Sequence, residues 1–485
     1  MSDAVRVLLR FDTEDILTPE SDDAALALAE LLSRQGVRAT FPITAMKVDA
    51  LLARGRQDVL RALGRHQIGF HSTSHSYHPT IAEQLATLAG QAAVDAFRAR
   101  EQAGFMRVAE VFGEAPTVYT QPGGNWTAEA IPALLGWGVR CFYSEAWNGY
   151  IDIDGRPMVL AGVLHWAAPV SVPKPWLSQI PQLHDQTLRM IGRAIAEQSA
   201  GGRLGLVNAV THPTELVTTR FWDADPFGGG VNAAEDTWQP PPLRPHQMVS
   251  QALYSFADWL TTVRAAGPDV AFWTAEDLVA AFSDQAPRLQ VTAGAQLTLL
   301  KLVAAGQLGS VAIGTVTLTP AEVLAVCLQS VAAIEHGQFP RPLTVPVQAP
   351  PWDEDATDVG RQAGQMAAPV LAEALRALSR SSQDGQVPAR VWADKAAWSP
   401  LAVAAAGARM GLELLGSGQR PERVPLPEVK LLTRRFVKPA QALHWDWPIF
   451  APGFSAPALR QRAEAVCWCL KPAEAEFADH CLDAH

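Results

Sequence analysis

The first 285 residues alternate between short apolar segments and amphipathic segments, and this alternation restricts the fold more than any other feature of the chain. VRVLLRF (residues 5–11) predicts a strand, and residues 21–36 predict a helix that starts at a serine and ends at a glycine. The pattern continues with strands predicted at 37–43, 67–70, 116–120, 139–144, 203–211 and 269–275, and helices at 48–63 and 127–138. It predicts a parallel sheet or barrel wrapped by helices, with the chemistry at the carboxyl ends of the strands.

The chain is too long for one ordinary domain, because 485 residues correspond to roughly two or three. The segment SDQAPRLQ, after Phe282, predicts a linker, and the rest of the chain is rich in alanine and leucine. We therefore expect residues 1–285 to form a catalytic domain that folds separately from a mostly helical domain at residues 286–485.

The second part repeats itself, since residues 318–346 parallel residues 398–425. Pro320 and Pro400 each follow a threonine or serine, an arrangement typical of a helix start. The pattern faintly resembles cell-wall-binding repeats. We expect instead a scaffolding or dimerisation unit, and only the dimerisation role would make the protein a homo-oligomer.

Composition excludes several functions. A formal net charge of -10 gives no electrostatic reason to bind nucleic acid or anionic membranes. No apolar run approaches the ~20 residues of a membrane span. The N-terminal segment enters a strand without the pattern of a signal peptide, and the five cysteines are scattered and unpaired in spacing. These features predict a cytoplasmic protein with reduced thiols.

A cluster of histidines follows the third predicted strand, in GFHSTSHSYHPT (residues 69–80). The four-residue spacing of His71 and His75 places both imidazoles on one face of a helical turn, a usual arrangement for two ligands of one metal ion. A capped turn whose serines bond to the local backbone is the alternative. His78 lies on the same helical side and could be a further ligand, but we expect it to orient a neighbour or cap the turn.

Three other strand ends carry polar or turn-forming residues, namely RFDTED (10–15), TQPGGNW (120–126) and THP (211–213). Together with HSTSH they resemble the motifs of the polysaccharide deacetylases of carbohydrate esterase family 4, the NodB-homology fold. The resemblance covers about residues 5–285; the histidine motif matches fully and the others in part. It implies a distorted (β/α)7 barrel and metal-dependent hydrolysis of an N-acetyl amide on a sugar.

The resemblance also implies roles for individual residues. It makes Asp12 the general base, His71 and His75 metal ligands, and His212 the general acid. The family's second aspartate is Thr13 here. Because residues two apart in a strand share a face, Glu14 points with Asp12, and we expect Glu14 to be the third ligand, with Asp15 as the alternative. Two histidines and one carboxylate favour Zn2+, while other divalent ions remain open.

Two further sets of residues complete the expected site. The family's arginine falls at Thr120, and Arg10, on the strand face of Asp12, is the candidate substitute. The turn after residue 120 could hold an oxyanion with its backbone N–H groups, and three tryptophans could stack on a sugar or pack in the core. The expected substrate-binding residues are Gln121, Gly123, Gly124, Trp126, Trp147 and Trp222. The segment 214–245 is expected to form a loop or lid over the site.

These observations lead to three alternative functions. The leading one is a metal-dependent deacetylase that acts on a carbohydrate or a related amide. The second is a cytoplasmic amidohydrolase on the same fold that cleaves another C–N bond. The third is a non-catalytic carbohydrate-binding scaffold.

Overall fold

The computed structural model describes residues 5–145, 151, 156–168, 189, 191–193, 196, 204–267, 269–351, 364–439 and 443–482. At its centre is a ten-stranded sheet with the order β20-β6-β7-β5-β4-β3-β2-β1-β8, in which β9 also pairs with β1. The strand pairs are parallel except β6 with β7 and β20 with β6. The strands are β1 (Val5–Phe11), β2 (Thr40–Ile43), β3 (Gln67–Phe70), β4 (Val118–Thr120), β5 (Cys141–Glu145), β6 (Met158–Leu160), β7 (Val163–Ala168), β8 (Gly205–Thr211), β9 (Val270–Trp273) and β20 (Leu470–Pro472).

Strand β1 organises this sheet, because it pairs with three neighbours. It runs beside β8 along its whole length, beside β9 at its amino end and beside β2 at its carboxyl end, where Arg10 lies opposite Thr40. Six of its seven residues are buried, as a strand covered on both faces requires. The parallel pairing brings the carboxyl ends of β1, β2, β3 and β8 to the same edge of the sheet.

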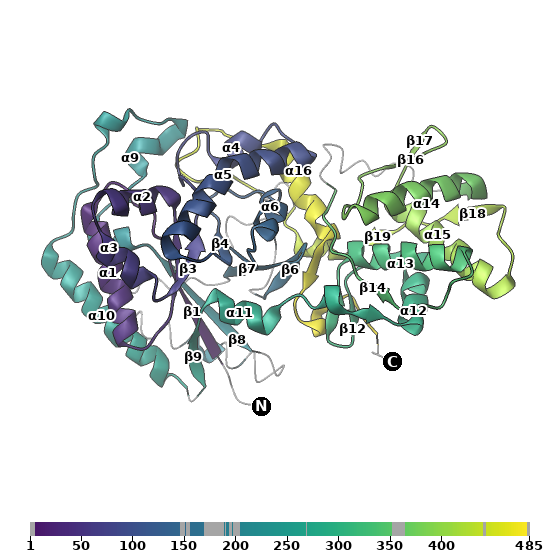
Figure 1. Ribbon diagram of the computed structural model, residues 1–485, viewed down its shortest axis with the longest axis horizontal. Helices are drawn as coiled ribbons and strands as arrows, with labels where there is room; N and C mark the ends of the chain where they lie inside the picture. Colours follow the sequence, from purple (N-terminus) through teal and green to yellow (C-terminus); the bar gives the residue numbers. More distant parts are fainter. Residues whose placement is uncertain are drawn as a thin grey trace.

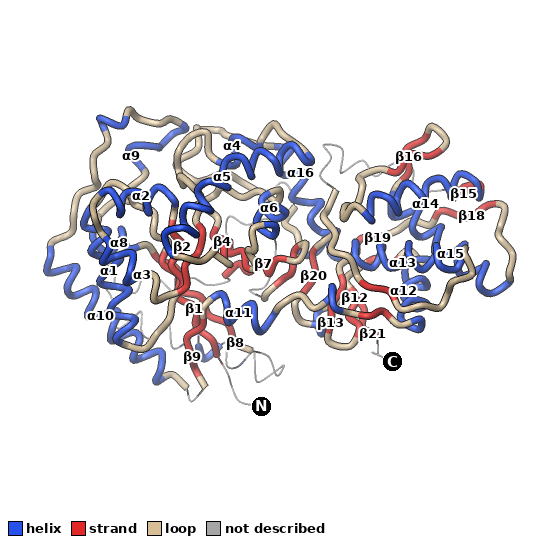
Figure 2. Tube along the Cα trace, viewed as in Figure 1, coloured by secondary structure: helices blue, strands red, loops and turns tan. Residues whose placement is uncertain are grey.

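The predicted α/β class is confirmed, and the expected barrel is present as a curled sheet (Figure 2). Within the described ranges, its end strands β8 and β20 do not pair with each other. The described strands therefore form an open, curled sheet, which bears out the distorted (β/α)7 barrel implied by the resemblance only in part.

Helices pack around this sheet, with α1, α3 and α10 side by side in Figure 1. The helix predicted at 48–63 is wrong in its length, because the chain breaks into α2 and α3 at Gly55, whose φ of 69° a right-handed helix does not allow. The helices of this part are α1 (Pro19–Arg34), α2 (Ala45–Ala53), α3 (Gln57–Leu63), α4 (Ile81–Leu85), α5 (Gly90–Phe112), α6 (Ala130–Gly136), α8 (Pro213–Val217), α9 (Ala224–Phe227), α10 (His246–Ala265) and α11 (Ala275–Phe282).

The second part is mostly helical, and Figure 1 shows α12 (Ala293–Ala304), α13 (Pro320–Glu335), α14 (Ala368–Gln383) and α15 (Pro400–Ser417) gathered away from the sheet. Thr319 and Ser399 cap α13 and α15 by accepting backbone N–H groups, and a proline follows each, as predicted. A β-hairpin precedes each of these two helices, formed by β12 (Val311–Ile313) with β13 (Val316–Leu318) and by β16 (Val391–Ala393) with β17 (Ala396–Trp398). No helix in the described part of the chain combines the length and the apolar character that crossing a bilayer needs.

Short strands join the outer segments of this part. β10 (Gln290–Val291) pairs with β14 (Leu343–Thr344), and β15 (Gly364–Ala367) with β18 (Arg423–Leu426), both antiparallel. β11 (Gln307–Leu308) pairs with β19 (Lys430–Leu431), and β12 with β21 (His480–Leu482), both parallel. These pairings tie the last residues of the chain to its helical part.

The end of the chain also returns to the first part, through α16 (Pro457–Ala465) and β20, drawn in yellow in Figure 1. Arg462 of α16 forms a fully buried ion pair with Glu129 and donates to the carbonyl of Leu85. Lys471 of β20 lies 2.9 Å from both Asp284 and Glu322, so the segment expected to be a linker takes part in a buried ionic cluster. The division at residue 285 stays a prediction, and its test has to take these contacts into account.

We expect Arg462→Ala to lower the free energy of unfolding by about 3–5 kcal/mol, because it leaves the Glu129 carboxylate buried without its counter-charge. Arg434, which is 69% exposed beside Glu464, provides the matched control, and Arg434→Ala should cost at most about 1 kcal/mol. Urea unfolding followed by tryptophan fluorescence measures both. Equal effects of the two substitutions would contradict a structural role for the buried pair.

Limited proteolysis tests the division at residue 285. A cut between Phe282 and Thr292 should give two fragments that still elute together on size exclusion, because β20 and α16 keep the second fragment bound to the first. Fragments that separate and each remain folded would show that the contacts across the boundary add little.

Candidate metal centre

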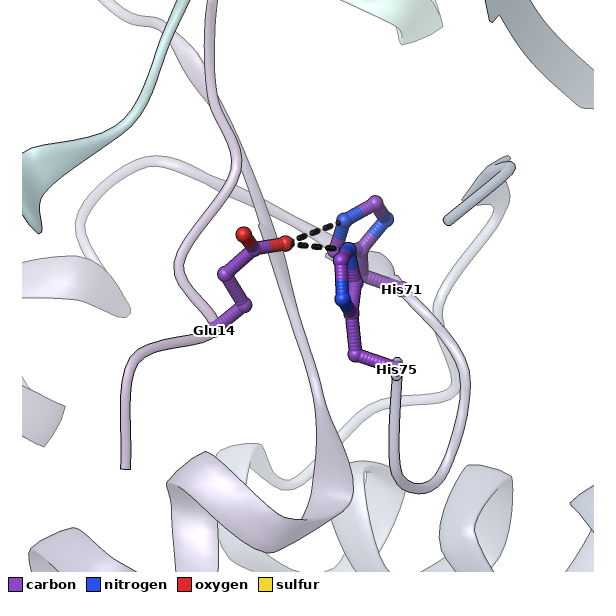
Figure 3. A group of neighbouring side chains, drawn as sticks. All are labelled: Glu14, His71 and His75. Carbon is purple, nitrogen blue, oxygen red and sulfur yellow. Dashed lines mark hydrogen bonds and ion pairs between the residues drawn. The ribbon is translucent and has the colours of Figure 1, made fainter. Parts of the chain in front are cut away.

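Three side chains converge at the carboxyl edge of the sheet. Oε2 of Glu14 lies 2.9 Å from Nε2 of His71 and 2.6 Å from Nε2 of His75, and Figure 3 shows the carboxylate facing both imidazoles. One ligand atom from each residue lies within 4.8 Å of the other two. Two imidazoles and one carboxylate form the donor set that Zn2+ takes in many catalytic sites.

The two histidines come from a loop, so the helical turn predicted for HSTSH is wrong. His71 directly follows β3, and the chain then reverses through two left-handed residues, Ser72 (φ 72°) and His75 (φ 53°). The Ser72 hydroxyl accepts the backbone N–H of His75 at 2.9 Å and holds this turn. The ring centroids of the histidines end 4.9 Å apart, although the backbone between them is not helical. Non-glycine residues in this conformation are strained, and such strain clusters at functional sites.

The outer nitrogen of each imidazole also has a partner. Nδ1 of His71 lies 2.9 Å from the carbonyl oxygen of Thr120, and Nδ1 of His75 lies 2.6 Å from the hydroxyl of Ser76. The Ser76 hydroxyl in turn donates to Oδ2 of Asp223 at 2.5 Å. When the Nδ1–H group of a histidine donates a hydrogen bond to an outer partner, the lone pair of Nε2 is available to bind a metal ion. Both rings have the orientation that a metal site requires.

The Glu14 carboxylate is held as an anion. Its side chain is fully buried, and Nε1 of Trp222 donates to its Oε1 at 3.0 Å. Burial by itself raises the pKa of Glu14, but the charges and hydrogen bonds of His75 and His71 outweigh it and keep this pKa well below the usual range. Burial lowers the pKa of His75, against the attraction of Glu14. A buried anion beside the His75 imidazole, whose pKa is lowered, suits a bound divalent cation.

Asp15, the alternative ligand, is used in a turn. Its Oδ1 accepts the backbone N–H groups of Leu17 and Thr18 at 2.8 and 3.0 Å, and its Oδ2 accepts the hydroxyl of Thr214 at 2.6 Å. Its carboxylate is thus committed to the start of α1 and to α8. The strand alternation that separated Glu14 from Asp15 agrees with this placement.

His78 is also used structurally. Its Nδ1 lies 2.7 Å from Glu83 and its Nε2 lies 2.8 Å from the carbonyl oxygen of Phe227. These bonds join the histidine loop to the segment at 214–245, as expected for a residue that orients its neighbours.

Asp12 and His212, the expected proton carriers, lie beside the triad. Nε2 of His212 is 3.9 Å from Oδ2 of Asp12, and Nδ1 of His212 is 3.2 Å from Oε2 of Glu215. Burial opposes protonation of His212, but the hydrogen bond that its Nδ1–H donates to Glu215 and the charges of Glu14, Glu215 and Asp12 raise its pKa to about 9. The His212 side chain is 24% exposed and that of Asp12 is 5% exposed, so His212 is the more open to solvent.

Arg10 lies where its candidate role requires. Its Nε is 3.2 Å from Oδ1 of Asp12, and its guanidinium lies 5.4 Å from the ring centre of Tyr143. The family's arginine position, Thr120, instead supports His71 with its carbonyl and lies 3.0 Å from the same nitrogen with its hydroxyl. The charge beside Asp12 is therefore supplied from its own strand.

The expected substrate-binding residues have mixed placements, and their roles stay predictions. In the turn after β4, the side-chain amide of Gln121 donates a hydrogen bond to the backbone carbonyl of Gly123 at 2.9 Å. Trp126 is 1% exposed and stacks on Trp445 with ring centres 4.6 Å apart. Trp222 is 2% exposed and bonds Glu14, whereas Trp147 lies outside the described residues.

Several residues of this site were not predicted from the sequence. Glu215 could have been found, because HPTE places it three residues after His212 at the start of a helix. No local pattern in the sequence indicates Asp223. Its place in the site is evident only from the structure, where burial and the charge of Glu14 raise its pKa to about 7. Trp447 comes from near the end of the chain and lies 5.2 Å from His75 between ring centres, which no spacing in the sequence indicates.

Comparison with known proteins relates the first part of this chain to a known family. Residues 3–142 match the family model described as polysaccharide deacetylase, which includes Asp12, Glu14, His71 and His75. No curated protein matches the chain significantly.

Solved structures show only distant likeness. A pseudoenzyme of the CE4 family from Bacillus anthracis has 12% identity and a TM-score of 0.32 over 56% of this chain and 64% of its own, so the chain spans less than two thirds of that protein. A peptidoglycan N-acetylglucosamine deacetylase has 14% identity and a TM-score of 0.31 over 56% and 87%. A GH57-type branching enzyme from Pyrococcus horikoshii has 10% identity and a TM-score of 0.37 over 57% and 70%. Likenesses this weak carry no argument about activity.

We expect the purified protein to bind one Zn2+ per chain, and His71→Ala or His75→Ala to remove it without unfolding the protein. His78→Ala is the matched control from the same loop, and it should keep the metal because His78 faces Glu83. Elemental analysis gives the zinc content and circular dichroism checks the fold. Full zinc occupancy in the His71→Ala, His75→Ala double variant would show that the triad is not the site.

Proposed function

We propose that this protein is a metal-dependent hydrolase that removes an N-acetyl group from a sugar or a related amide. The observation that carries the proposal is the placement of the Glu14, His71 and His75 triad beside a carboxylate and an imidazole, those of Asp12 and His212. The match of residues 3–142 to the polysaccharide deacetylase family supports deacetylase chemistry in general.

Glu14, His71 and His75 would hold the metal ion, and their nitrogen and oxygen donors suit Zn2+ best. When bound, a divalent ion supplies Lewis acidity, which lowers the pKa of water and polarises an amide carbonyl. Thr120, Ser76 and Trp222 keep the three ligands in place through the hydrogen bonds described above. This support leaves the ligands preorganised, so little rearrangement is needed at the moment of reaction.

The protons would be moved by the protein's own groups. Asp12 accepts a proton from the water molecule whose oxygen adds to the carbonyl carbon, and Arg10, 3.2 Å from Oδ1 of Asp12, orients this carboxylate. His212 donates its Nε2 proton to the amide nitrogen as the C–N bond breaks. The products are acetate and the free amine, and transfer of the proton from Asp12 to His212 restores the starting state.

The helical part would have a separate role. We propose that residues 286–485 contain a duplicated unit, on the grounds that the hairpin before α13 and the hairpin before α15 lead into capped helices of the same design. A binding or dimerisation role fits such a unit, and the whole protein would act in the cytoplasm as a homo-oligomer.

The direct test measures acetate release from N-acetylglucosamine and its short oligomers by zinc-loaded protein, before and after chelation. Acetate that appears with zinc and is lost on its removal is the expected result. Bound zinc without acetate release would favour a hydrolase for another C–N bond. A chain that binds neither zinc nor sugar amides would oppose both enzymatic functions.

We expect the deacetylation rate to fall as the pH rises toward about 9, because His212 must carry its proton to act as an acid. A bound cation offsets the charge of Glu14, which places this fall at or below that value. His212→Gln should remove the fall and reduce the rate about 10²- to 10⁴-fold. Glu215→Gln should move it to lower pH, because it deletes a hydrogen bond that raises the pKa of His212. A variant at His212 with wild-type turnover would remove it from the mechanism.

A further inference from the structure

A segment from near the end of the chain lies across the candidate metal centre. This segment, residues 443–454, is called the strap below. Its backbone joins the expected lid loop, because the N–H groups of Gly229 and Gly230 donate to the carbonyls of Pro448 and Ile449 at 3.0 and 2.8 Å. These two backbone hydrogen bonds hold the strap and the loop side by side.

Trp447 is the strap residue that reaches the site. Its ring meets the ring of His75 edge-on, at 5.2 Å between centres and an interplanar angle of 89°. On its other side it fills the space beside the turn after β4, since a Cβ atom at Gly123 would lie only 2.5 Å from Cε2 of Trp447. Gly124 touches the Cβ atom of the same tryptophan, where an added Cβ would lie 3.2 Å away. Both glycines are thus matched to the indole that covers them.

The cover leaves the triad almost inaccessible. The side chains of Glu14, His71 and His75 are 0%, 2% and 4% exposed. Trp222 closes the side of Glu14, and Ile449 of the strap packs in the same small apolar cluster as Trp222. His212, whose side chain is 24% exposed, is the most exposed of the expected catalytic groups, so we expect a substrate to approach from its side.

The strap is fixed at both ends of its path. Trp445 stacks on the buried Trp126, and the chain continues from the strap into α16, where Arg462 pairs with the buried Glu129. Movement of the strap would have to disturb these contacts. The cover is accordingly a wall of the site, built by the second part of the chain.

We infer that Trp447 is a specificity-determining residue that restricts the site to a single N-acylated ring or to the end of a short chain. The inference rests on the proposed function. An interior unit of a polysaccharide needs a groove that is open on both sides, because the chain continues in both directions from the reacting unit. The strap closes the site beside His75 and Gly123, so such a unit has no path for one of its neighbours. A terminal unit needs only the side near His212.

The experiment maps deacetylation along the hexamer of N-acetylglucosamine by mass spectrometry. The wild-type protein should release acetate only from a terminal unit. Trp447→Ala should raise the ratio of interior to terminal deacetylation about tenfold or more, since a steric barrier is removed. Trp447→Phe keeps a smaller apolar ring and should shift the ratio in the same direction by less. Trp392→Ala, which removes a 62% exposed tryptophan of a distant hairpin, should leave the ratio unchanged.

Transfer of zinc to a coloured chelator gives a second measurement that does not depend on activity. Zinc should leave Trp447→Ala about tenfold faster than the wild type or Trp392→Ala, because the wall beside His75 is gone. Interior deacetylation by the wild type, or equal zinc transfer from all variants, would overturn the inference. Complete absence of acetate release from sugars, with zinc still shielded by Trp447, would instead refute the proposed function and leave the wall in place.

Discussion

The buried carboxylate of Glu14 is the feature on which the site depends. A charge without water around it is costly unless opposite charges and hydrogen bonds surround it. Two imidazoles and one indole N–H lie within hydrogen-bond distance of it here, and they come from the loop after β3 and from the loop after α8. Thr120 and Ser76 in turn hold His71 and His75 from behind. A divalent cation at this point would satisfy the same requirement, which is why the geometry suits a metal ion.

The roles around this carboxylate are distributed in a way specific to this chain. Arg10 supplies positive charge to Asp12 from two residues earlier on the same strand, and its position follows directly from the alternation of β1. Thr120 is then free to orient His71 through its carbonyl and hydroxyl. Arg10 thus supplies the positive charge that the resemblance places at position 120, while Thr120 holds the proposed ligand His71.

The end of the chain connects the two parts of the molecule. α16 and β20 place a buried arginine and a buried lysine against acidic groups of earlier segments, and the strap lies between the helical part and α16. Burying two charged side chains costs free energy, and their attraction offsets this cost only when the two groups meet in the right geometry. Buried ion pairs of this kind therefore favour one arrangement of the chain over others more than they raise its net stability. Trp447 lies on the segment just before α16 and contacts His75, so the shape of the site depends on residues far outside the region that matches the family.

Local patterns in the sequence were sufficient for seven of the ten strands of the central sheet (β6, β7 and β20 were not predicted), for the helix caps of α13 and α15, and for the grouping of Asp12, Glu14, His71 and His75 at one edge of the sheet. Burial alternation, capping residues and parallel strand order act over a few residues or one strand crossing, so they can be read without coordinates. The loop conformation of HSTSH could not be predicted. Two histidines four residues apart can be brought together by a helical turn or by a turn through left-handed residues, and the sequence does not distinguish the two. Only the tertiary structure decided the partners of the site: Trp222 reaches Glu14 across 208 residues, and Arg462 reaches Glu129 across 333. Contacts of that range are set by how whole elements pack, and no local spacing carries a trace of them.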